Sequence, residues 1–145
     1  MFHQQDRQQL RRYYYEAWAK ARRGEPLEPL EGIIAGVIGH HPEYHSLLED
    51  DDEDRLDRDY PPEAGQTNPF LHLGLHIAVQ EQLHANRPAG VIDAYRAIAD
   101  RSGDTHTAEH RVMECLAEVI WQAQRDGAAP DEQVYLQRLR RLAQQ

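Results

Sequence analysis

The sequence has little of what marks secreted or membrane proteins. It contains one cysteine, Cys115, so no internal disulfide can form. No apolar run approaches the roughly 18 residues that a transmembrane helix needs, and the N-terminal stretch MFHQQDRQQLRR lacks the apolar core of a secretory signal. These absences favour a cytoplasmic protein without a membrane partner. The 145 residues are enough for one domain spanning 1–145 with a core of its own.

Common catalytic motifs are also missing. GVIG and PAG do not fit a glycine-rich phosphate loop. Neither Ser46 nor Ser102 has an evident base and orienting group, so a serine triad is not indicated. The paired Glu-x-x-His motifs and additional glutamates of di-iron carboxylate bundles are absent as well. The sequence therefore leaves open whether the protein is an enzyme.

Acidic residues outnumber basic ones, and they are concentrated in one stretch. The formal net charge is −9, and EDDDEDRLDRD, residues 49–59, holds eight acids against two arginines. The expected first helix, residues 6–23, is by contrast basic. A nucleic-acid-binding protein needs a dominant basic face, so the overall balance argues against nucleic acid as a partner. We expect an acidic loop at 49–67 that is solvated, lacks regular structure over most of its length and lies near the basic helix.

What the sequence does contain is helical periodicity with clear start and stop signals. Asn68 suits an N-cap and Pro69 a first helical residue, whereas Gly103 and Gly127 are suited to ending helices. No segment alternates like a strand. Helices are expected at residues 6–23, 29–39, 40–48, 68–86, 91–101 and 105–126, and from 131 onward. The predicted fold class is all-α: a compact helical bundle of roughly six helices with a long acidic loop.

Histidines are the most unusual feature of the sequence. The chain has nine, and three pairs lie four residues apart, a spacing that makes helical neighbours: His41 and His45, His72 and His76, and His106 and His110. A random placement would give about half such a pair. Two imidazoles on one helix face recur in metal sites, so the excess indicates metal binding.

Helical geometry predicts that two of these pairs face inward. At about 100° per residue, His106 and His110 share the arc of Met113 and Trp121, and Glu114 lies at its edge. His72 and His76 lie beside Val79 and Leu83. Imidazoles with one carboxylate suit iron, zinc, manganese or nickel. The predicted ligands are His72, His76, His106, His110 and Glu114, with His41 or His45 completing the set.

An alternative interpretation needs no metal. Histidine is intermediate in burial, so each imidazole could be a neutral residue at the core margin that donates to a backbone carbonyl. The His41 and His45 pair carries the least weight, because Pro42 pushes the residue before it out of helical geometry. The spacings of His110 to Glu114 and of His72 to His76 are similar to those of the ligands in hemerythrin-type bundles. In the alternative the protein holds no cofactor.

Long stretches of the chain resemble one family. They include YEAWAK, GEPLEPLE, HPEYH, DRDYPPEAGQTNPFLHLGLHIAVQEQ, RPAGV, AEHRVMECLAEVIWQAQRDG and PDEQVYLQRLRRL. Together these stretches resemble the proteobacterial family catalogued as domain of unknown function 1841. The resemblance spans nearly the whole chain and implies a small bacterial cytosolic protein. It implies no activity, substrate or site residues.

Two hypotheses of function follow. The first is a helical protein that binds a transition metal, with oxygen, redox or hydrolytic chemistry as candidate activities. The second is a non-enzymatic module for protein interaction or homo-oligomerisation, without a metal. In the second, exposed aromatics of the first helix, the acidic loop and the C-terminal helix would contact an unknown partner or a second copy.

Overall fold

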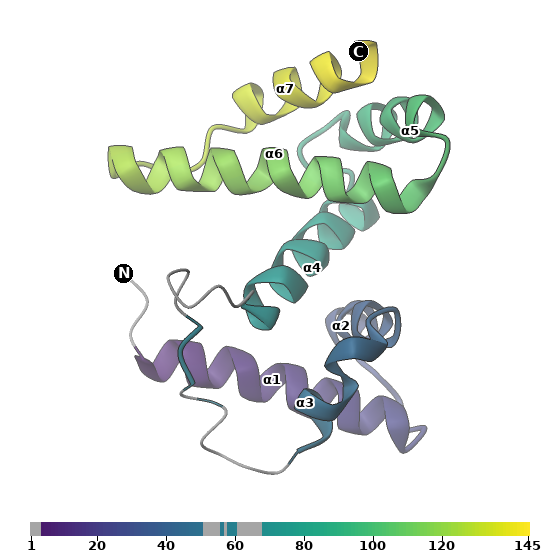
Figure 1. Ribbon diagram of the computed structural model, residues 1–145, viewed down its shortest axis with the longest axis vertical. Coiled ribbons are helices and arrows are strands. Elements are labelled where there is room, and N and C mark those ends of the chain that lie inside the picture. The colour runs from purple at the N-terminus through teal and green to yellow at the C-terminus, as the bar shows by residue number, and fades with distance from the viewer. Residues whose placement is uncertain (1–3, 51–55, 57, 61–67) are drawn as a thin grey trace. The chain divides into compact units, whose positions relative to one another are not determined.

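The computed structural model describes residues 4–50, 56, 58–60 and 68–145 of the chain. This part of the chain forms seven α-helices and one short 3-10 helix, and no strand (Figure 1). The elements are α1 (Gln4–Arg22), α2 (Pro29–Gly39), η1 (Pro42–Tyr44), α3 (His45–Glu49), α4 (Pro69–Ala85), α5 (Val91–Ser102), α6 (Thr105–Asp126) and α7 (Glu132–Gln144). The all-α prediction is confirmed, and the helix bounds lie close to those expected.

The chain divides into two compact units, Met1–Ile77 and Ala78–Gln145. The division falls inside α4, so the first half of this helix belongs to one unit and the second half to the other. That residues 1–145 act as one domain stays a prediction.

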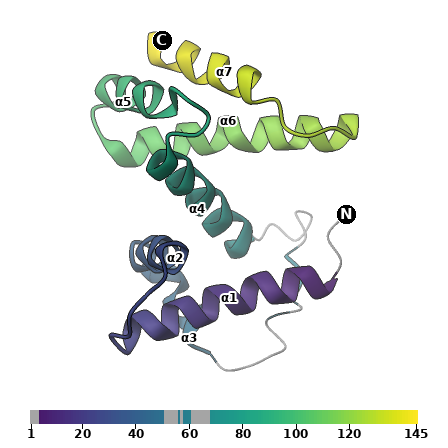
Figure 2. The ribbon, with the colours of Figure 1, turned by 180° about the vertical axis from the view of Figure 1, so that it is seen from behind.

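In the first unit α1 packs against α2 and α3 (Figures 1 and 2). The core contains Tyr14, Ala17, Ile34, Val37, Ile38, Leu48, Phe70, Leu73 and Ile77. The remaining α1 aromatics, Tyr13, Tyr15 and Trp18, are partly buried against this core. The expectation of exposed aromatics on the first helix is therefore wrong, because the core of this unit takes up their apolar surface.

An ion pair between Lys20 and Glu31 joins α1 and α2. Glu31 in the first turn of α2 accepts a hydrogen bond from the Glu28 amide at 2.9 Å, which satisfies one of the open N–H groups at a helix start. The same carboxylate accepts hydrogen bonds from Lys20 Nζ at 2.9 and 3.0 Å. Glu31 thus both helps to start α2 and joins it to α1.

Most of the predicted acidic loop, residues 51–55, 57 and 61–67, lies outside the described residues. Its described part contacts α1, as expected. Arg7 Nη1 lies 2.7 Å from Asp59 Oδ1, and Arg11 Nη1 donates to the carbonyls of Leu56 and Arg58 at 3.1 and 2.9 Å. Basic residues of α1 therefore bind both a carboxylate and two backbone carbonyls of this segment.

In the second unit α5, α6 and α7 pack against one another. The buried residues of these helices are Val91, Ala94, Ile98, Ala108, Val112, Met113, Cys115, Leu116, Val119, Ala123, Tyr135, Leu136 and Leu139. The Tyr135 hydroxyl donates to Gln82 Oε1 of α4 at 2.6 Å, and burial raises the pKa of Tyr135. Cys115 is a buried free thiol whose pKa burial raises, as expected of a small core residue.

The buried face of α6 differs from the predicted one. Ala108, Val112 and Leu116 are buried, whereas His106 is exposed and Trp121 is 56% exposed. The prediction that both His106 and Trp121 face inward is therefore wrong. The helical period allows several apolar arcs on α6, and its packing against α5 and α7 selects the one centred on Val112.

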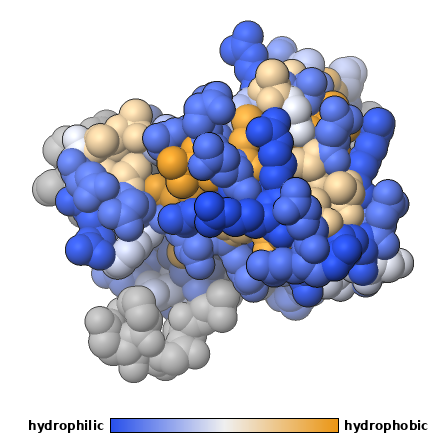
Figure 3. Space-filling view, turned by 90° about the horizontal axis from the view of Figure 1, so that it is seen from above, coloured by the Kyte–Doolittle hydropathy of each residue, from blue (hydrophilic) through white to orange (hydrophobic). Residues whose placement is uncertain are grey.

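The face of the molecule drawn in Figure 3 is mostly hydrophilic, and its hydrophobic residues lie in small separate patches. Within the described part of the chain, no helix combines the length and the apolar character that crossing a membrane requires.

Candidate metal centre

The site begins where α2 ends. Gly39 is the last residue of α2, and Pro42 opens η1. His41 lies between them with φ −126° and ψ 70°, outside the helical region, as expected for a residue before proline. Its amide still donates to the Ile38 carbonyl at 2.9 Å, which ties the turn to the helix end.

Three imidazoles donate to consecutive carbonyls of the last turn of α2. His40 Nδ1 donates to Gly36 O at 2.8 Å, His41 Nδ1 to Val37 O at 2.7 Å, and His45 Nε2 to Ile38 O at 2.8 Å. Carbonyls only accept, so each of these ring nitrogens carries the proton. These carbonyls also accept hydrogen bonds from the backbone amides of His40 and His41, so each imidazole is a second donor at the helix end. In its neutral form His41 therefore keeps the lone pair on Nε2.

The second part of the site lies on α4. Asn68 caps this helix, because its Oδ1 accepts hydrogen bonds from the amides of Phe70 and Leu71 at 3.0 and 3.2 Å. One helical turn separates His72 from His76, and their Nε2 atoms lie 3.2 Å apart. The prediction that these two imidazoles lie side by side on one helix is confirmed.

His41 and the α4 pair meet in the interior of the first unit. Nε2 of His41 lies 3.2 Å from Nε2 of His76. Among the described residues, His41, His72 and His76 form a group whose metal-ligating atoms all lie within 4.8 Å of one another. His76 is 3% and His41 7% exposed, and His72 is half-buried.

Two of the three pairwise separations suit a shared metal ion. Two nitrogens at about 2.1 Å from one ion, at angles between roughly 90° and 110°, lie about 3.0 to 3.4 Å apart. The two Nε2 separations of 3.2 Å fall in this range. The bond from His41 Nδ1 to Val37 O is of the kind that fixes the tautomer and orientation of imidazoles in metal sites.

An aromatic ring that the sequence analysis missed stands beside the group. Tyr44 of η1 stacks nearly parallel to His41, with centroids 5.8 Å apart, and lies edge-on to His72 at 6.1 Å. Burial, with a smaller contribution from Glu43, raises the pKa of its phenol. The one available signal was position: Tyr44 follows His41 by three residues in the HPEY turn.

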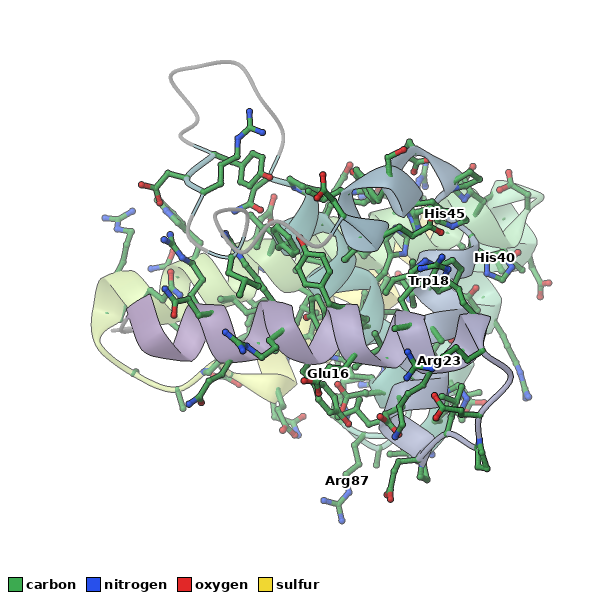
Figure 4. The ribbon with its side chains drawn as sticks, turned by 90° about the horizontal axis from the view of Figure 1, so that it is seen from below. Glu16, Trp18, Arg23, His40, His45 and Arg87 are labelled. Atoms are coloured by element: carbon green, nitrogen blue, oxygen red, sulfur yellow. The ribbon has the colours of Figure 1, made fainter. Side chains whose placement is uncertain are left out.

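The remaining predicted ligands do not belong to this group of three. His45 packs its ring against Trp18, with centroids 4.7 Å apart (Figure 4), and is not part of the group. His106 and His110 begin α6 in the second unit with ring centroids 4.4 Å apart, and His110 Nδ1 donates to the His106 carbonyl at 2.9 Å. Glu114 is exposed on the same helix. Their meeting with His72 and His76 stays a prediction.

Residues 6–141 match the family described as Domain of unknown function (DUF1841), so the chain belongs to this family. The family resemblance drawn from the sequence is thereby confirmed. No curated protein and no solved structure matches the chain.

Proposed function

We propose that this member of the DUF1841 family binds one divalent transition-metal ion through Nε2 of His41, His72 and His76. The observation that carries the proposal is the convergence of three imidazole nitrogens from two separate elements, α4 and the turn after α2. Two of these rings, His41 and His76, are buried. A neutral buried histidine needs only one acceptor for its single N–H, so burial alone does not require three imidazoles to converge.

The donor set bears on which ions fit. Imidazole suits zinc, iron, nickel and copper, whereas magnesium and calcium prefer oxygen ligands. Among the four ions predicted from the sequence, which are iron, zinc, manganese and nickel, an all-nitrogen set favours zinc, iron and nickel over manganese. His106, His110, Glu114 and His45 do not belong to the proposed ligand set.

The competing explanation is a hydrogen-bonded row of neutral histidines without an ion. His76 Nε2 stands 3.2 Å from both other Nε2 atoms, and it has a single proton to donate there. His76 Nε2 can therefore form a hydrogen bond with only one of its two neighbours, whereas a metal ion could accept the Nε2 lone pairs of all three histidines.

The test is metal binding by untagged protein. Wild-type protein titrated with Zn²⁺ or Co²⁺ in a calorimeter should bind one equivalent. His72→Ala and His76→Ala should each weaken binding by more than the roughly 100-fold that loss of an outer contact costs, because each removes a direct ligand. Circular dichroism establishes that each variant keeps its helices.

Matched controls are available on both elements. His40 donates to α2 as His41 does, and His84 donates from Nδ1 to the Gln80 carbonyl at 2.7 Å on α4. Both are exposed, and neither belongs to the group of three. His40→Ala and His84→Ala should bind the ion like wild type. Unchanged binding in folded His76→Ala, or none in wild type, would refute the proposal.

A further inference from the structure

We infer that the ion proposed above takes a small anion from solution as a further ligand, on the side of His72 and beside the ring of Tyr44. This inference rests on the proposed function and adds to it a ligand class and a residue that sets ligand size.

The number of ligands is the first argument. Sites in which zinc is purely structural have four protein ligands, whereas sites with three protein ligands bind water or a substrate in the fourth position. The group contains three imidazoles among the described residues. An ion held by these three has a coordination position for an exogenous ligand.

Charge decides which kind of ligand is favoured. Imidazole ligates in its neutral form, so three histidines leave the ion with both of its positive charges. The surroundings are partly desolvated, since His41 and His76 are at most 7% exposed, and charge interactions are stronger there than in water. Hydroxide or another small anion is therefore the favoured further ligand.

Burial indicates the side from which this ligand arrives. His41 and His76 are buried, whereas His72 and Tyr44 are half-buried. The group is thus open to solvent along His72, where the edge-on ring of Tyr44 stands 6.1 Å from the imidazole. A ligand entering there passes beside this ring.

Tyr44 is positioned to limit ligand size. The Tyr44 ring stacks nearly parallel to the His41 ring, at an interplanar angle of 11°. This contact keeps the Tyr44 ring beside His41, one of the three proposed protein ligands. Tyr44 ends the short η1 turn and His41 directly precedes that turn, so the ring has little freedom to withdraw. We assign Tyr44 the role of excluding large anions while admitting small ones.

The experiment uses the Co²⁺-loaded full chain, whose visible spectrum reports on the coordination of the ion. Titration with azide should give a saturable spectral change. Tyr44→Ala should still bind Co²⁺ and azide, and should gain at least about tenfold in affinity for benzoate, the range in which pocket shape discriminates between ligands. Tyr13→Ala, a half-buried tyrosine of α1, is the matched control and should behave like wild type.

The outcomes separate the two proposals. No bound Co²⁺ in wild type overturns both. Bound Co²⁺ with a spectrum that azide leaves unchanged overturns this inference alone, because the ion then has a full set of protein ligands. An azide response combined with unchanged benzoate affinity in Tyr44→Ala removes Tyr44 from the role of limiting ligand size.

Discussion

At the scale of single residues, Glu31 is a side chain that contacts two helices, α1 and α2. Its carboxylate accepts from the Glu28 amide and from Lys20, and the residue is 5% exposed. The amide hydrogen bond, and then the Lys20 ammonium, lower the pKa of this carboxyl below its ordinary value of 4.5. The charged form is therefore favoured by folding.

Glu31→Gln should remove a pH-dependent part of the stability. With a lowered pKa in the folded state, the unfolded state binds more protons, so this contribution is complete above pH 4.5 and is lost as pH falls through the folded-state pKa. Urea unfolding of wild type and variant at a series of pH values should show a difference that disappears in acid. Glu25→Gln, which breaks the exposed pair with Arg23 at 2.7 Å, should show little effect. A difference independent of pH would contradict this account.

Histidine spacing predicted the site in part. His72 and His76 meet because four residues is a local, helical distance, and the sequence was sufficient for that. His41 was paired with His45, yet its Nε2 meets a residue 35 positions away. Pro42 gave the only local hint, since it turns His41 out of the helix that would have aligned the pair. The partner itself depends on how α4 packs, which no spacing encodes.

At the scale of elements, helix ends were predictable because their causes are local. Asn86 follows α4 with φ 50°, and Gly103 and Gly127 follow α5 and α6 with positive φ. These are residues that tolerate the left-handed conformation in which helices stop. The buried face of α6 was not predictable in the same way, because it depends on its neighbours α5 and α7.

The N-cap of α6 should be worth a measurable share of stability. Asp104 accepts from the Thr107 amide at 2.6 Å and from its hydroxyl at 2.9 Å, and the amide bond is the main cause that lowers the pKa of Asp104. Asp104→Ala should cost about 1 kcal/mol in the free energy of unfolding, measured by urea denaturation at neutral pH. Glu114→Ala, an exposed change within the same helix, is the control. Equal stability of the two variants would show that the cap contributes nothing.

At the scale of the whole molecule, α4 is the element that the two units share. Phe70, Leu73 and Ile77 belong to the core of the first unit. Further along the helix, Gln82 accepts from Tyr135 and Gln80 Nε2 donates to Glu109 Oε1 at 3.0 Å, both within the second unit. The proposed ligands of α4 lie in its first half, so an ion bound there acts directly on the first unit.

Hydrogen exchange should therefore locate the effect of the ion. Binding joins the turn after α2 to α4, so Zn²⁺ should slow amide exchange at residues 36–48 and 69–77. At a free Zn²⁺ concentration of 100 times Kd the stabilisation is about 2.7 kcal/mol, or roughly 100-fold slower exchange for amides that exchange only when the site opens. His76→Ala with Zn²⁺ should show no such slowing. Added protection at residues 105–114 would bring His106 and His110 into the ligand set. Bound Zn²⁺ without protection at residues 36–48 would contradict ligation by His41.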